Sequence, residues 1–193
     1  MVAADFAAAI PLLPFVSFLI AMLGGYFAPR LLPKGGAIPG ILALGGSLLL
    51  SLWVLADVAA GNYTNEELYA WVVGQDTFSL HFGVLLDPLS ALMLVIVSLV
   101  AFLVFVHSLG YMNDEGETGL PRYYAGLSLF SFSMLAFVLA DNLLMSFVFF
   151  ELVGLCSWLL IGFWFREDAP ASAAKKAFLV TRFGDYFFLV GVV

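Results

Sequence analysis

Long apolar runs dominate this 193-residue sequence. Several exceed the ~20 residues that an α-helix needs to cross a hydrocarbon core of about 30 Å. Hydrophobic residues make up 63% of the chain and charged residues 11%, whereas charged residues are about 25% of a typical soluble domain. A membrane β-barrel would need alternating segments of about ten residues, which these runs lack. The sequence therefore predicts an all-α, polytopic transmembrane helical bundle.

Five complete spans and the start of a sixth fit this pattern. They cover roughly residues 6–28, 36–56, 86–109, 123–139 and 143–165, with the sixth from 173 onward. No Lys or Arg precedes the first run, which favours a retained span over a cleaved signal peptide. The last run is still apolar at Val193, so we expect this sequence to be the N-terminal part of a longer protein.

The distribution of cations predicts an orientation. Cytoplasmic loops of membrane proteins are enriched in Lys and Arg. If the N-terminus is outside, one side of the membrane receives Arg30, Lys34, Arg122, Arg166, Lys175 and Lys176, while the segment 57–85 has no Lys or Arg. We therefore expect a multi-pass protein of the cell inner (cytoplasmic) membrane with its N-terminus outside.

The segment between spans two and three has a strand-like pattern. In LYAWVVGQDTFSLHFGV two short β-prone runs flank Gly74-Gln75-Asp76, and apolar residues alternate after this turn. The alternating residues are Phe78, Leu80, Phe82 and Val84. We expect a small extracytoplasmic β-hairpin here, lying over the outer ends of the helices.

Two helix starts are marked by capping residues. Asp87 is a suitable N-cap, and Pro88 suits the first helical position because its missing N–H is not needed there. Asp141 and Asn142 predict a tight outer turn that caps the fifth span.

Charged residues break the apolar pattern deep inside two spans. Glu151 is eight residues into its run, about 12 Å from the outer end, and Asp185 is about 18 Å from the cytoplasmic end of its own. In a core of about 30 Å these depths coincide. Arg182 lies one turn from Asp185, within reach of an intrahelical ion pair. Inserting a charged residue at the centre of a membrane helix costs about 2.5 to 3.5 kcal/mol on insertion scales. We therefore expect these residues to have either a compensating partner or a function.

Two interpretations of these charges remain open. In the functional one, protonatable groups at mid-membrane form part of a proton or cation path. Because burial and a nearby cation act on a carboxylate in opposite directions, a Lys or Arg that moves relative to Glu151 would switch it between holding and releasing a proton. In the structural one, Arg182 and Asp185 neutralise each other, and Glu151 hydrogen-bonds to a neighbouring helix.

Two further residues are weaker candidates for such a path. Lys176 could contribute to it, or its side chain could extend into the headgroup region. His107, near the cytoplasmic end of the third span, could titrate near neutral pH, or could be an interfacial hydrogen-bonded histidine.

One face of the fifth span carries Phe147, Glu151, Gly154, Trp158 and Gly162, and the two glycines would let another helix approach closely.

Composition argues against several other functions. The formal charge of −7 opposes nucleic acid as a partner, because the basic surface that such partners require is missing. The sequence shows no metal-ligand cluster and no glycine-rich phosphate loop, and its single cysteine is Cys156.

Three segments carry a resemblance to a known family: LADNLL, ELVGLCSWLLIGFW and KKAFLVTRFGD. With the surrounding sequence from about Phe78 to the end, the chain resembles the antiporter-like membrane subunits of respiratory complex I, most closely the chain 5 (subunit L) type. The resemblance implies that Glu151 is the key protonatable carboxylate and that Lys176, Arg182 and Asp185 belong to a polar network near it. Phe150 stands where the family often has tryptophan.

The family fold implies an organisation for the chain. It is a long bundle of two inverted five-helix repeats, and the first repeat begins at the fourth helix. Residues 1–110 would then hold the N-terminal helices with the outer hairpin, and residues 111–193 the start of the first repeat. The broken helix with its central lysine and the second repeat would lie past Val193, so pumping would belong to the parent protein.

The leading hypothesis is a proton-translocating membrane subunit of an NADH-quinone-oxidoreductase-like respiratory complex. Flavin and iron–sulfur clusters would belong to partner subunits, with no cofactor in this chain, and its partners would be other membrane subunits and the lipid bilayer. The alternative is a subunit of a multi-subunit Na⁺/H⁺ antiporter or an inorganic-carbon uptake complex. A third hypothesis is a membrane scaffold whose buried charges only fix helix register.

Overall fold

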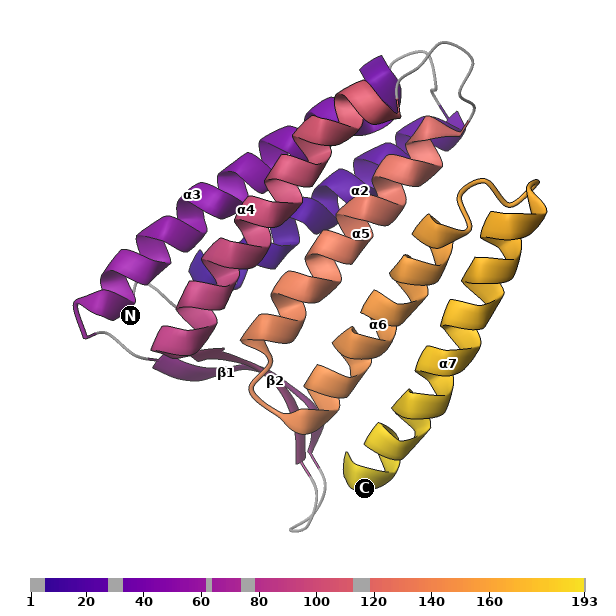
Figure 1. The fold of residues 1–193 in the computed structure, drawn as a ribbon. Helices are drawn as coiled ribbons and strands as arrows, with labels where there is room; N and C mark the ends of the chain where they lie inside the picture. The colour runs from indigo at the N-terminus through magenta and orange to yellow at the C-terminus, as the bar shows by residue number, and fades with distance from the viewer. Residues whose placement is uncertain (1–5, 28–32, 62–63, 74–78, 113–118, 193) are drawn as a thin grey trace.

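The computed structural model describes residues 6–27, 33–61, 64–73, 79–112 and 119–192, with side chains of the strands from residue 83 onward. Its helices are α2 (Ala9–Phe27), α3 (Ala37–Ala59), α4 (Pro88–Tyr111), α5 (Leu120–Leu139), α6 (Leu143–Ile161) and α7 (Asp168–Val192). A short 3-10 turn, η2 (Pro33–Gly36), precedes α3, and strands β1 (Thr64–Val73) and β2 (Ser79–Leu86) lie between α3 and α4. The long helices run side by side, with the strands at one end (Figure 1). The predicted all-α bundle is confirmed.

Five of the helical segments are long and apolar enough to cross a membrane: α2, α4, α5, α6 and Lys34–Ala59, which includes α3. The chain is therefore a multi-pass membrane protein. The sixth helix, α7, is 25 residues long and more highly charged than the others. Its charged residues are Asp168, Lys175, Lys176, Arg182 and Asp185.

Two helix boundaries differ from the sequence prediction. α6 ends at Ile161, four residues before the predicted end, with Gly162 as its C-cap. α7 begins at Asp168, five residues before the predicted start. Pro170 does not prevent this early start, because the first turn of a helix needs no N–H donors. Asp168 in the first turn also interacts favourably with the helix dipole.

Both predicted helix caps are confirmed. The Asp87 side chain accepts a hydrogen bond from the Ser90 backbone N–H at 2.6 Å, and the Asp87 N–H donates to Ser90 Oγ at 2.8 Å. At the start of α6, Asn142 Oδ1 accepts from the Met145 N–H at 2.8 Å. These caps fix where α4 and α6 begin. The Asn142 cap thereby sets the position of Glu151 along α6.

β1 and β2 form an antiparallel pair that runs from Thr64 opposite Leu86 to Val73 opposite Ser79. The predicted turn at 74–76 and Phe78 lie outside the described residues. Val84 of β2 also forms an isolated bridge with Ala140, which links the strand pair to the connection between α5 and α6. The strand pair is thereby held against the ends of the helices.

The hydrophobic core lies among α2, α3, α4 and α5. One cluster near the strands includes Ile10, Val54, Leu86, Leu94 and Leu135. A second includes Leu44, Phe105 and Tyr124. α6 packs against α5 and α7, and α7 packs against α6, so these two helices extend the bundle on one side (Figure 1). The candidate site lies between these last two helices.

Candidate charged site between two helices

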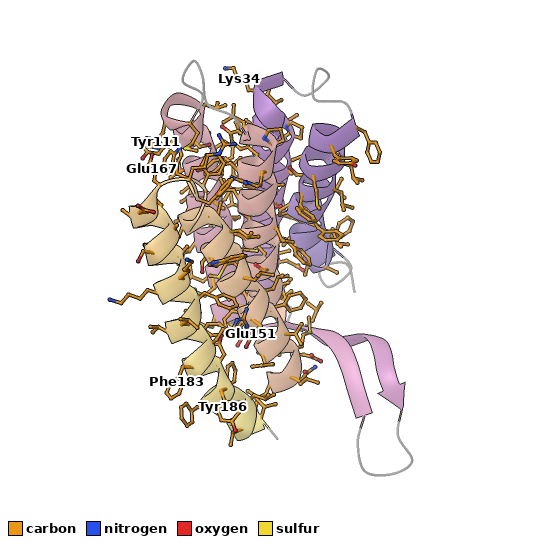
Figure 2. The ribbon with its side chains drawn as sticks, turned by 90° about the vertical axis from the view of Figure 1, so that its right-hand side faces the viewer. Lys34, Tyr111, Glu151, Glu167, Phe183 and Tyr186 are labelled. Atoms are coloured by element: carbon orange, nitrogen blue, oxygen red, sulfur yellow. The ribbon has the colours of Figure 1, made fainter. Side chains whose placement is uncertain are left out.

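Glu151 lies in the middle of α6, eight residues from its first residue, Leu143. In Figure 2 it lies between the end of the bundle that carries Lys34 and Glu167 and the opposite end, near Tyr186. Its side chain is 21% exposed, although the helix around it is apolar. The carboxylate is therefore placed within the membrane-spanning part of the helix.

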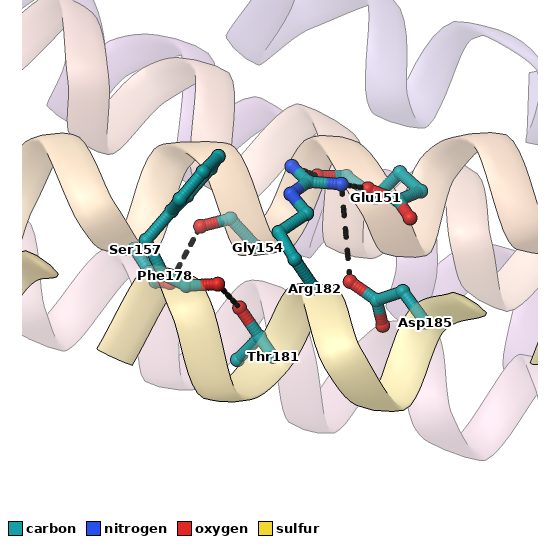
Figure 3. A network of polar contacts seen from close by, with 7 residues as sticks. All are labelled: Glu151, Gly154, Ser157, Phe178, Thr181, Arg182 and Asp185. Carbon is teal, nitrogen blue, oxygen red and sulfur yellow. Dashed lines mark hydrogen bonds and ion pairs between the residues drawn. The ribbon is translucent and has the colours of Figure 1, made fainter. Parts of the chain in front are cut away.

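Arg182 of α7 contacts Glu151 at two points. Its Nη1 atom forms an ion pair with Glu151 Oε2. Its Nη2 atom donates a hydrogen bond to the backbone carbonyl oxygen of Glu151 at 3.2 Å (Figure 3). The guanidinium also lies 4.9 Å from the centroid of the Phe178 ring, one turn earlier on α7. These contacts hold the cation against α6 rather than in lipid.

Asp185 is the second acid of the cluster. Its Oδ2 atom lies 3.8 Å from Arg182 Nη1, and its side chain is only 6% exposed. Glu151 Oε2 and Asp185 Oδ2 are both buried and have no hydrogen-bond partner in the described part of the chain. The Arg182 charge is therefore their compensation among the described residues.

This arrangement confirms the predicted pairing of Arg182 with Asp185 and adds a direct pairing with Glu151. Asp185 lies 17 residues into α7, about 25 Å along it rather than the predicted 18 Å, because the helix starts earlier. Fully ionised, one cation and two acids carry one net negative charge. A proton on either acid would neutralise the cluster, so its charge depends on one proton.

The structure does not bring Lys176 to this cluster. Lys176 is exposed, and it lies nine residues before the buried Asp185, which places it on the opposite face of α7. His107 is also away from the cluster: it is exposed on α4, and its ring lies 6.0 Å from that of Tyr111. Neither residue contacts Glu151 in the described part of the chain.

The predicted helix face around Glu151 turns toward α7. Phe147 packs against Phe188 with ring centroids 5.6 Å apart, and Trp158 packs against Phe178 at the same distance. A Cβ at Gly162 would lie 3.2 Å from Ala174 Cβ, so this glycine permits the close approach that was predicted. Gly154 does not, because a Cβ there would meet no atom of the described residues within 4 Å.

Phe178 was not identified from the sequence as part of the site. The signal was the spacing of four residues between Phe178 and Arg182, which places both on one helix face. The described residues contain no group of three His, Cys, Asp or Glu side chains that could hold a metal ion. Because a carboxylate beside a cation can hold or release a proton, the contact between Glu151 and Arg182 permits proton exchange.

Comparison with known proteins agrees with the earlier resemblance. The family described as "NADH-Ubiquinone oxidoreductase (complex I), chain 5 N-terminus" matches residues 71–124, and "NADH:quinone oxidoreductase/Mrp antiporter, TM" matches residues 140–193. The second match contains Glu151, Arg182 and Asp185.

Relatives share substantial sequence identity. F(420)H(2) dehydrogenase subunit L of Methanosarcina mazei is 44% identical over 98% of this chain and 27% of its own length. NAD(P)H-quinone oxidoreductase subunit 5, organellar chromatophore 1, of Paulinella chromatophora is 44% identical over 95% of this chain and 28% of its own length. The chain thus spans about a quarter of the length of these relatives.

A solved structure shares the fold. A chain of the membrane-bound sulfane sulfur reductase, an archaeal respiratory membrane complex, superposes with a TM-score of 0.78 over 96% of this chain and 36% of that chain. At 19% sequence identity, this likeness concerns the fold alone.

Proposed function

Because the chain belongs to the family of chain 5 (subunit L) type membrane subunits of NADH:quinone oxidoreductases, we propose that its parent protein translocates protons within an NADH-quinone-oxidoreductase-like respiratory complex. The observation that carries this proposal is the placement of Arg182 between two acids from different helices. A purely structural pair would need only one acid.

Glu151 is the proposed proton carrier, and Arg182 controls its charge. While Arg182 lies against Glu151, the ionised carboxylate is compensated and a proton can leave. When Arg182 moves toward Asp185, Glu151 is left in an apolar helix and takes up a proton. Redox energy released in partner subunits would drive this movement. Lys176 and, more weakly, His107 would extend the proton path through segments of the parent beyond this chain.

Partner subunits would carry the redox cofactors. An iron–sulfur cluster is usually held by about four cysteine thiolates, and this chain has one cysteine. The proposed partners are therefore other membrane subunits together with subunits that bind flavin and iron–sulfur clusters. The two relatives described above are subunits of a dehydrogenase and of a quinone oxidoreductase, which supports the proposal that partner subunits carry the redox cofactors.

The proposed orientation places the N-terminus and the strand pair outside. Lys34 lies at the end of the bundle opposite the strands (Figure 2). Arg122 lies in the first turn of α5 and Arg166 in the connection between α6 and α7, at the same end (Figure 1), which is consistent with a cytoplasmic side rich in cations. The proposed division of the chain is 1–110 for the first helices and 111–193 for the start of the first repeat.

Glu151→Gln in the full-length protein within its complex tests the proton carrier. Glutamine keeps the size of the side chain but cannot release a proton. We expect assembly to persist and proton uptake into vesicles, measured during quinone reduction, to be lost. Glu167→Gln, which removes an exposed acid between α6 and α7, is the matched control and should leave uptake unchanged. Normal proton uptake by the assembled Glu151 variant would leave only the scaffold hypothesis.

A second candidate function is a subunit of a multi-subunit Na⁺/H⁺ antiporter or an inorganic-carbon uptake complex. The match described as "NADH:quinone oxidoreductase/Mrp antiporter, TM" favours keeping the antiporter alternative. Sodium efflux from vesicles that is driven by a pH gradient alone, without electron donor or quinone, would favour this candidate over the first.

A further inference from the structure

An apolar groove runs along the outside of the bundle, away from the charged cluster. It has a volume of about 670 Å³, within the range of about 300 to 1,000 Å³ that is typical of ligand sites. Its walls come from α2, α5 and the C-terminal end of α6. Small residues hollow its floor, including Ala21, Gly25, Ala125 and Gly126. Met22, which also lines it, is 56% exposed, so the groove opens to the surroundings of the bundle.

The groove follows the helix axes and changes in character along its length. On α5 it is lined from Pro121 to Leu129, a distance of about 12 Å, and Arg122 lies at the Pro121 end. Its deep end is apolar, with Phe18 and Leu129, and its mouth holds Arg122 together with Tyr26, which is 81% exposed. This order, from a cation and an amphipathic ring at the helix ends to hydrocarbon further in, matches the polarity of one leaflet of a bilayer.

Arg122 is held in position at this mouth. Its Nη2 atom donates a hydrogen bond to the Phe163 carbonyl oxygen at 2.8 Å. The guanidinium lies 5.2 Å from the centroid of the Phe163 ring and 4.9 Å from that of Phe165. A guanidinium has five N–H donors, and among the described residues this is the one hydrogen bond that Arg122 donates, which leaves donors for an anion. Among the described residues, no carboxylate forms an ion pair with Arg122.

A second cation lies on the other side of Arg122. A hollow of about 370 Å³ shares Arg122 and Leu159 with the groove and is also lined by Lys175. Arg–phosphate contacts are frequently bidentate, and a lysine adds a point charge for the same anion. The positive charge at the mouth complements a phosphate, and the apolar wall complements an acyl chain.

We propose that this groove binds an anionic phospholipid, with an acyl chain between α2 and α5 and its phosphate on Arg122. The site is separate from the charged cluster between α6 and α7, and it does not depend on the proposed function. The lipid would bridge the first helices of the chain to the end of α6. Two alternative occupants are a further helix of the parent or of a partner, and a soluble phosphate at Arg122 alone.

The test counts bound lipid on the full-length protein. Delipidated protein in detergent is titrated with dioleoyl phosphatidylglycerol or, separately, with the zwitterionic phosphatidylcholine, and bound lipids are counted by native mass spectrometry. Arg122→Gln should weaken phosphatidylglycerol binding about tenfold, as expected for loss of a charge-assisted contact, and should weaken phosphatidylcholine binding less, because the choline cation offsets the charge of its phosphate. Lys34→Gln removes an exposed cation at the same end of the bundle, outside the groove, and should have no effect (Figure 2).

Two further arms separate the occupants. Ala125→Leu fills the groove without a change of charge and should weaken phosphatidylglycerol binding while Arg122 remains. Inorganic phosphate in excess should not displace the lipid. The proposal is overturned if phosphate alone competes fully, or if Arg122→Gln and Ala125→Leu leave lipid binding unchanged. It is also overturned if a lipid carrying a photoreactive group at its acyl end crosslinks to neither α2 nor α5 in the assembled complex.

Discussion

Arg182 on α7 contacts both the carboxylate and the backbone carbonyl oxygen of Glu151 on α6. The carbonyl contact, at 3.2 Å, does not depend on the protonation of the carboxylate. Protonation of Glu151 would therefore weaken its attraction for Arg182 without releasing the arginine from α6 altogether. Asp185, 3.8 Å from the same guanidinium, is then the remaining anionic partner within reach. This geometry permits a small movement of one side chain to follow one proton.

Replacing Arg182 by methionine should destabilise the packing of α7 on α6. The substitution leaves Glu151 and Asp185 without compensation, and breaking a buried pair costs about 3 to 5 kcal/mol when the groups are fully buried. Because the side chains of Arg182 and Glu151 are 31% and 21% exposed, we expect a smaller loss, about 1 to 3 kcal/mol. Thermal unfolding of the full-length protein in detergent measures the loss.

The double variant Arg182→Met with Glu151→Gln provides the control. It removes both the cation and the acid that the cation compensates, so it should recover part of the stability lost in Arg182→Met. Additive losses from the two single substitutions would show that the residues are not coupled.

Replacing Asp185 by asparagine should separate stability from proton movement. Asparagine keeps the shape of the side chain but is not an anion, so Arg182 would have Glu151 as its only acidic partner in the cluster. We expect proton uptake by vesicles of the assembled complex to fall while its unfolding temperature changes little. If uptake is unchanged, Asp185 does not serve as the second position of Arg182. Asp168→Asn is the matched control, since it removes an acid at the exposed start of the same helix and should leave proton uptake unchanged.

Much of the helical bundle follows from the sequence, because each span is a long apolar run and the caps at Asp87 and Asn142 are local signals. The boundary between α6 and α7 was not predicted correctly from the sequence. The sequence pattern predicted a connection at 166–172, but the connection runs from 162 to 167, because α6 ends at its Gly162 C-cap and α7 already begins at Asp168. Composition alone does not distinguish a loop from a polar helix end.

The candidate site was predicted in its members and not in its contacts. A charge inside an apolar run is conspicuous, so Glu151, Arg182 and Asp185 could be identified from the sequence. Which partner Arg182 meets depends on how α6 and α7 are rotated against each other, and apolar runs with little amphipathic character leave that rotation undetermined. The same undetermined rotation explains why Lys176 was a candidate for the proton path, although it lies on the face of α7 opposite the cluster.

Gly40→Ala should destabilise the contact between α3 and α4. A Cβ at residue 40 would clash with the ring of Phe105, whose side chain is fully buried. The ring cannot move without disturbing the core, so we expect a loss of about 1 to 3 kcal/mol, which is typical of overpacking. Thermal unfolding of the full-length protein measures it.

Gly45→Ala on the same helix is the matched control. A Cβ there would lie 3.6 Å from Phe102, an ordinary contact. Because alanine favours a helix over glycine by about 0.5 to 1 kcal/mol, this variant should be as stable as the parent or more stable. Equal effects of the two substitutions would contradict the assignment of a close contact to Gly40.

Asp87 should make the stability of the protein depend on pH in the acidic range. The hydrogen bond from the Ser90 backbone N–H holds the pKa of the Asp87 carboxyl below its ordinary value of 3.8. The folded state therefore binds this proton less tightly than the unfolded state, and stability falls as the pH falls through the folded pKa. The contribution of the charge is complete above the unfolded pKa and is lost below the folded one.

Comparison of the parent with Asp87→Asn and Asp87→Ala isolates this contribution. Asparagine caps a helix about as well as aspartate but carries no charge, so Asp87→Asn should be less stable than the parent near neutral pH, and this difference should disappear at an acidic pH below the folded pKa of Asp87. Asp87→Ala removes the cap itself and should be about 1 kcal/mol less stable than Asp87→Asn at both pH values. Unfolding temperatures of the full-length proteins in detergent measure both differences. A difference between the parent and Asp87→Asn that persists unchanged at acidic pH would show that the charge of Asp87 does not stabilise α4.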